Sequence, residues 1–117
     1  MRDFRSIKVW EKSHQLTLAI YAVTRQFPNE ERFSLTDQMR RSSSSIPTNI
    51  AEGCGRDGDA ELRRFMQISM GSASELEYQL LLAQDLGYLP SGDYQNLMDR
   101  TTEVKRMLSS FIKRLRK

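Results

Sequence analysis

The glycine-rich segment from Gly53 to Gly58 reads Gly-Cys-Gly-Arg-Asp-Gly and offers the most obvious chemistry in the sequence. Its glycine spacing is that of loops that approach a pyrophosphate in dinucleotide-binding proteins, where a strand precedes the loop. No strand pattern occurs in this chain, so the spacing predicts a turn between two helices. One alternative is a phosphate- or nucleotide-binding enzyme, with backbone amides and Arg56 holding the anion.

Metal or nucleophilic chemistry would have to use His14 or Cys54, the single histidine and the single cysteine. Metal sites in helical bundles combine paired carboxylates with two Glu-x-x-His motifs, and His14 has no such neighbours. Cys54 could pair only with His14 from the far end of the chain. We therefore expect no metal, no cofactor, no catalytic residue and a non-enzymatic protein.

Basic residues are concentrated near the C-terminus, although the net charge is only +3. Residues 104–117 contain six cations and no acid, whereas the rest of the chain has more acids than cations. This tail could contact nucleic acid, or it could serve solubility and the negative end of a helix dipole. Its cations are Lys105, Arg106, Lys113, Arg114, Arg116 and Lys117.

The segment from Arg40 to Gly53 is the most unusual polar run, with four consecutive serines followed by an Ile-Pro pair. A helical spacing of four, four and three places four of its residues on one face, which predicts a polar seam with Glu75. Those four residues are Arg41, Ser45, Asn49 and Glu52. Alternatively, Arg40, Arg41 and the serine hydroxyls contact a ligand or RNA.

Apolar residues recur every three or four positions in four segments, and no segment alternates as a strand would. This spacing predicts one all-α domain over 1–117, with helices at about 7–27, 35–53, 59–86 and 92–116. The last helix carries the clearest stripe, including Leu97, Val104 and Leu108. Short linkers between helices of similar length favour an antiparallel up-down-up-down four-helix bundle.

Proline and glycine residues mark the expected irregularities of these helices. Pro47 lies inside the second segment and predicts a kink, with the serines at 42–45 satisfying the carbonyl groups that the proline frees. We expect Gly53 and Gly55 to close that helix in left-handed geometry, and Gly87 to end the third helix.

The third segment carries more apolar surface than a small bundle needs. Leu80, Leu81 and Leu82 together cover a wide arc of the helix, while Met66 and Met70 also fall off its main stripe. We interpret Met66, Met70 and Leu81 as a self-association surface. There are two alternatives: the surface could contact a different protein, or the chain's own core could cover more of this helix.

Three observations indicate the cellular compartment in which the protein is expected. A single cysteine suits a reducing environment, and no run approaches the roughly 18 apolar residues of a membrane span. The first eight residues carry charges where a signal peptide is apolar. We therefore expect a cytoplasmic protein without membrane contact.

Four stretches of the sequence resemble a known family: Phe4 to Trp10, the Arg40 to Gly53 segment, Gly71 to Glu77, and Gly87-Tyr88-Leu89. They are similar to the bacterial four-helix bundle proteins encoded in intervening sequences of 23S ribosomal RNA genes, over nearly the whole chain. The resemblance implies a ring-shaped homopentamer with no established enzymatic activity.

The same resemblance implies which binding partners this protein has. The location of these genes implies a link to RNA, and the fold is similar to that of the accessory protein of diversity-generating retroelements, which binds nucleic acid and a reverse transcriptase. The resemblance therefore implies an adaptor whose partners are its own copies and RNA or an RNA-processing or reverse-transcriptase protein. A purely structural protein-interaction module is the alternative.

Overall fold

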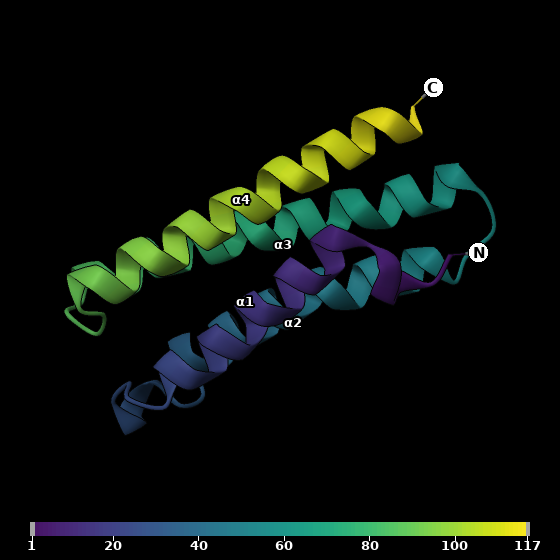
Figure 1. Ribbon diagram of the computed structural model, residues 1–117. Coiled ribbons are helices and arrows are strands. Elements are labelled where there is room, and N and C mark those ends of the chain that lie inside the picture. Colours follow the sequence, from purple (N-terminus) through teal and green to yellow (C-terminus); the bar gives the residue numbers. More distant parts are fainter. Residues whose placement is uncertain (1, 117) are drawn as a thin grey trace.

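The computed structural model describes residues 2–116 and contains four long helices without any strand in that range (Figure 1). The helices are α1 (Lys8–Thr24), α2 (Leu35–Cys54), α3 (Asp59–Asp85) and α4 (Ser91–Leu115). Short 3-10 turns, η1 (Phe4–Ser6) and η2 (Asn29–Glu31), precede α1 and α2. The predicted all-α four-helix class is confirmed.

The helices pack lengthwise into a rod of about 44 × 23 × 19 Å around one apolar core. Each helix contributes side chains with no exposed surface, because its apolar residues recur at the spacing that keeps them on one face. Examples are Leu16 from α1, Ile46 from α2, Leu76 from α3 and Leu108 from α4.

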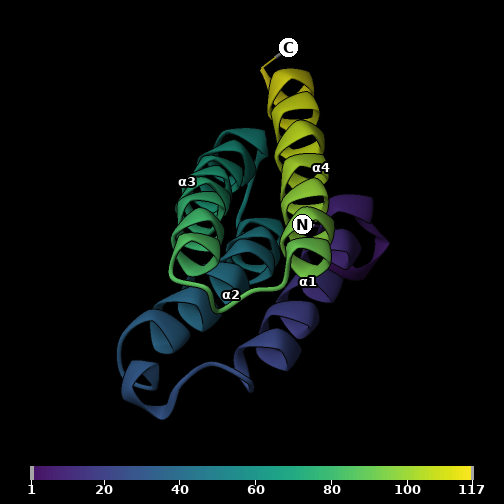
Figure 2. The ribbon, with the colours of Figure 1, turned by 90° about the vertical axis from the view of Figure 1, so that its left-hand side faces the viewer.

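Two hydrogen bonds join parts of the chain that are far apart in the sequence. Arg63 near the start of α3 donates to the carbonyl of Leu115 at the end of α4 (3.1 Å). The backbone N–H of Arg2 likewise donates to the carbonyl of Cys54 at the end of α2 (3.1 Å). Both chain termini lie at the same end of the rod, and α3 and α4 lie together above α1 and α2 (Figures 1 and 2).

The first helix is shorter than predicted, since α1 ends at Thr24 and not at Phe27. Beyond Thr24 the backbone N–H groups bond three residues back, as in the bond from Phe27 to Thr24 (3.1 Å), which tightens the last turn. This turn brings Phe27 into the core, where its ring lies 5.4 Å from that of Tyr88.

The backbone angles of the glycines contradict the predicted end of α2 and confirm the predicted end of α3. Gly53 lies inside α2 and Gly55 has a φ of −84°, so neither closes the helix in left-handed geometry. Within residues 2–116, positive φ angles occur at Gly58 and Gly87, both at 82°. Gly87 ends α3 as predicted, because its N–H and that of Tyr88 bond back to Gln84 and Ala83 and satisfy the last carbonyl groups.

Pro47 is buried within α2, and the helix continues on both sides of it. The kink expected at this residue stays a prediction.

Candidate nucleic-acid interface

A hollow of about 270 Å³ lies between the first turn of α1 and the last turns of α4. Arg106, Ser110 and Arg114 reach it because residues four apart share one face of a helix. Lys8 closes it from α1. We call this site the basic hollow; it is lined by Lys8, Val9, Arg106, Met107, Ser110, Phe111 and Arg114.

The three cations of the basic hollow carry uncompensated charge. Lys8, Arg106 and Arg114 are exposed, and none forms an ion pair with another residue in the range 2–116. No acidic side chain lines the hollow. A site with three positive charges and no acid attracts anions.

Phe111 gives the basic hollow an aromatic surface between cations. The guanidinium of Arg114 lies 5.0 Å from the centre of its ring, and that of Arg2 lies 5.6 Å from it. Val9 and Met107 add aliphatic surface beside the ring. Cations that bind phosphates beside a ring on which a base can stack are the combination that single-stranded nucleic acid requires.

The other predicted nucleic-acid contacts lie elsewhere, and three of the six are engaged within the chain. Lys105 pairs with Glu77 (2.7 Å), and Arg41 pairs with Asp37 (2.9 Å). Arg40 donates through Nε to the hydroxyl of Thr24 (2.9 Å).

Three further predicted cations lie at or beyond the end of α4. Lys113 and Arg116 are exposed near the end of α4, while Lys117 lies outside the described residues. Of the predicted residues that the structure describes, Arg106 and Arg114 alone line the basic hollow. Lys8 was missed, although the predicted bundle order would have placed the start of the first helix beside the end of the last.

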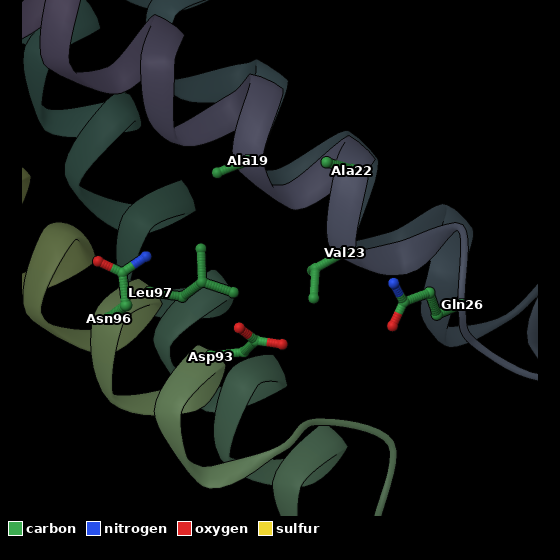
Figure 3. A pocket seen from close by; sticks show the side chains of 7 residues that line it. All are labelled: Ala19, Ala22, Val23, Gln26, Asp93, Asn96 and Leu97. Atoms are coloured by element: carbon green, nitrogen blue, oxygen red, sulfur yellow. The ribbon is translucent and has the colours of Figure 1, made fainter.

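A second hollow of about 280 Å³ lies between α1 and α4 toward the other end of the rod (Figure 3). Asp93 of α4 and Gln26, in the turn that follows α1, line it together with apolar carbons of Val23 and Leu97. The negative charge of Asp93 disfavours a phosphate there. The two hollows between α1 and α4 are therefore oppositely charged, and an anion favours the basic one.

The glycine-rich loop lines a smaller hollow of about 120 Å³, in which both cations face acids. Arg56 pairs with Glu52 (3.0 Å), and Arg2 pairs with Asp59 in the first turn of α3 (3.3 Å). A carboxylate at that helix start already satisfies the positive end of the helix dipole. These pairs disfavour the anion site that the sequence suggested at Arg56.

Cys54, beside this loop, is only 2% exposed. Its burial raises the pKa of the thiol above the ordinary value of 9.0, with the positive charge of Arg2 opposing the shift in part. The thiol therefore stays protonated near neutral pH, and a protonated thiol is a poor nucleophile.

The polar seam predicted on α2 is narrower in the structure. Ser45 bonds to Ser72 of α3 (2.9 Å), and Asn49 donates to the carbonyl of Ser45 (2.8 Å). Arg41 instead pairs with Asp37 within α2, and Glu52 pairs with Arg56 in the turn that follows α2. Glu75 is exposed.

The surface predicted for self-association needs one correction. Met66 has no exposed surface and belongs to the chain's own core, because α3 packs against both α2 and α4 and so buries a wide arc. Met70 is partly buried against the core, whereas Leu81 is 43% exposed. Of these three residues, Leu81 alone is well placed to contact another molecule.

Neither a metal cluster nor a membrane span occurs in the described part of the chain. No three His, Cys, Asp or Glu side chains in residues 2–116 are grouped so that they could hold a metal ion. None of the helices described is both long enough and apolar enough to cross a membrane.

Comparison with known proteins identifies a family and a solved structure that the chain resembles. The family model described as 23S rRNA-intervening sequence protein matches residues 5–110. The crystal structure of a protein with unknown function from the S23 ribosomal protein family of Bacteroides thetaiotaomicron VPI-5482 is 29% identical and superposes with a TM-score of 0.83. That match covers 90% of this chain and 95% of the other. No curated protein matches the sequence.

Proposed function

This chain belongs to the family of 23S rRNA-intervening sequence proteins, and on that premise we propose that it is a non-enzymatic homo-oligomer that binds RNA at the basic hollow. The observation that carries the proposal is the grouping of Lys8, Arg106 and Arg114, without any acid, around the ring of Phe111. RNA is the anion that this combination of charge and aromatic surface fits best.

The geometry favours a single-stranded or looped RNA over a regular duplex. Bases in a duplex are stacked on one another, so their faces are not available to a protein ring. In a loop, a base could stack beside Phe111 while neighbouring phosphates contact the three cations. Binding of this kind tolerates many sequences, because every base has a face that can stack.

The test is a titration of a structured RNA with exposed loops, at low and at physiological salt. Changing Lys8, Arg106 and Arg114 together to Gln should weaken binding, since each neutralised phosphate contributes to counterion release. The slope of log affinity against log salt should become shallower by about 2 to 3, at roughly 0.7 to 0.9 for each phosphate that is no longer neutralised.

A matched control removes three cations that already face acids: Arg41, Arg56 and Arg64, each changed to Gln. Both variants have three positive charges fewer, so they differ only in where the charge is removed. The control should keep most of the affinity and the slope. Equal weakening in both variants would show that only bulk charge matters, and no binding by the wild-type protein would refute the RNA proposal.

A further inference from the structure

The outer side of α1 carries an apolar stripe that the bundle does not cover. Leu18 is 51% exposed and Tyr21 is 40% exposed. Trp10 and His14 extend the stripe toward the start of the helix, since the spacing of four, four and three keeps all of these residues on one side. We call this stripe, with Arg40 beside it, the aromatic face.

The aromatic face is held in place before any partner binds. The rings of Trp10 and His14 are stacked at 5.1 Å with their planes 6° apart. The guanidinium of Arg40 lies 4.9 Å from the centre of the Tyr21 ring, and the bond to Thr24 fixes its position. Preordered tryptophan, tyrosine and arginine side chains are the residues that dominate binding energy at protein interfaces.

A second apolar surface lies where α3 and α4 meet. Tyr78 is 61% exposed and Leu81 is 43% exposed. Together with Tyr94 and Met98 they line a hollow of about 510 Å³. We call this surface the tyrosine face. It is concave, whereas Leu18 projects from the aromatic face.

The two faces point away from each other. α1 and α3 each pack against α2 and α4, and the two make no direct helix-to-helix contact. Their outward sides therefore lie on opposite sides of the rod, so one molecule can use both faces at once with two different neighbours.

The charges beside the two faces are complementary. On the aromatic face, Arg25 and Arg40 flank Tyr21 and outnumber the one acid, Glu11, which lies two helical turns before Leu18. Asp85 lies one helical turn beyond Leu81 on the tyrosine face. None of these four forms an ion pair with another residue of the range 2–116. Opposite charges around matching apolar surfaces favour pairing of unlike faces over pairing of like faces.

We infer that the aromatic face of one molecule docks on the tyrosine face of a second copy of this chain, with Leu18 entering the hollow beside Tyr78 and Leu81. This inference rests on the homo-oligomeric part of the proposed function and specifies its contact. Because the two faces differ, the contact is heterologous and leaves one unused face at each end of a pair. Repetition of such a contact closes into a ring or continues as a filament.

The test uses two single variants, Leu18→Glu and Leu81→Glu, measured by light scattering after size-exclusion chromatography. Each puts a charge into one half of the contact at an exposed position, so circular dichroism should show an unchanged fold. Each variant alone should have the mass of one chain, 13.6 kDa.

Mixing the two variants is the decisive measurement. The Leu18→Glu chain keeps an intact tyrosine face and the Leu81→Glu chain keeps an intact aromatic face, so the mixture should form a 1:1 pair of twice 13.6 kDa and no larger species. The control is Phe33→Glu, which changes a residue that is 86% exposed outside both faces and should assemble like the wild type.

The outcomes separate the two proposals. A wild-type protein that assembles while Leu18→Glu also assembles, or a mixture that stays monomeric, overturns the docking contact but not oligomerisation. A wild-type protein with the mass of one chain at every concentration overturns both the contact and the homo-oligomeric part of the proposed function. RNA binding by such a monomer would leave the basic hollow as the remaining proposal.

Discussion

Thr17 of α1 places its hydroxyl oxygen 2.9 Å from the carbonyl oxygen of Ser43 in α2. Ser43 stands four residues before Pro47, so its carbonyl is the one that the missing N–H of the proline leaves without a helical donor. Ser43 is fully buried, which keeps water from replacing that donor. A neighbouring helix therefore supplies the hydrogen bond that Pro47 removes.

Replacing Thr17 by Val should destabilise the protein by about 1–3 kcal/mol, the usual cost of leaving a buried acceptor unsatisfied. Valine has nearly the same shape as threonine, so the change removes little else. The measurement is urea unfolding followed by circular dichroism, with the free energy of unfolding extrapolated to water.

The matched background for this change is Pro47→Ala, which restores an N–H that can bond to Ser43. In that background Thr17→Val should cost clearly less than in the wild type, because the carbonyl has regained a helical donor. The Thr17 hydroxyl also lies 2.9 Å from the carbonyl of Ser13, so a small residual cost is expected. An equal cost in both backgrounds would contradict the assigned role of Thr17.

Gly53 allows α2 and α3 to approach closely. A Cβ added at Gly53 would lie 2.8 Å from the Cβ of Phe65 and 3.1 Å from a methyl group of Leu62. Gly53→Ala should therefore force the two helices apart and destabilise the fold by about 1–3 kcal/mol, as overpacking usually does. The same unfolding measurement would show this as a lower midpoint.

Gly71 provides the control for Gly53, since it is also a glycine within a helix but has nothing within 4 Å of an added Cβ. Gly71→Ala should stabilise the protein by about 0.5–1 kcal/mol, because alanine is the better helix former. If Gly53→Ala also stabilised the protein, helix propensity and not overpacking would dominate at Gly53.

The fold was predictable because the spacing of apolar residues along each helix can be read from the sequence of that helix alone. Leu97, Val104 and Leu108 were assigned to the core from their spacing along one helix, and all three are buried. The donor to Ser43 was not predictable in the same way. Of the serines expected to satisfy that carbonyl, Ser42, Ser43 and Ser44 donate to carbonyl groups three residues back, and Ser45 bonds to Ser72. The donor to Ser43 comes from another helix.

The candidate site was only partly predictable for the same reason. Arg106 and Arg114 share one face of their helix, which the sequence shows directly. Lys8 joins them only through the alignment of α1 against α4. Met66 was misplaced because the sequence does not show that α3 packs against two neighbours, which extends its buried arc past the main apolar stripe.

The buried thiol of Cys54 should make stability depend on alkaline pH. Because burial raises the pKa of this thiol in the folded state above 9.0, the folded protein holds a proton that the unfolded chain releases. The resulting stability is fully present below pH 9.0 and is lost as the pH rises through the folded pKa. Unfolding midpoints measured across this range should fall with pH.

Cys54→Ala should make that fall shallower just above pH 9.0. Some dependence should remain at higher pH, because the hydrogen bond to Glu31 also raises the pKa of Tyr88. As a second readout, iodoacetamide should modify Cys54 slowly in the folded protein and faster in urea. Rapid alkylation of the folded protein at neutral pH would contradict a protonated, buried thiol.

Lys105 and Arg106 are neighbours in the sequence, but we expect only the loss of Arg106 to weaken RNA binding. Lys105 is engaged by Glu77 at 2.7 Å, whereas Arg106 lines the basic hollow without an ion pair among the described residues. Arg106→Gln should weaken RNA binding and reduce the slope of log affinity against log salt by about 1. Lys105→Gln should leave that slope nearly unchanged.

The comparison is sharp because both substitutions remove one positive charge from adjacent positions of α4. Long-range attraction of RNA to the molecule falls by nearly the same amount in both, so it cannot produce a difference between them. A difference in slope must then come from a phosphate contact made by Arg106 and not by Lys105. Equal slopes for the two variants, measured by fluorescence anisotropy over the same salt series, would place the RNA contact outside the basic hollow.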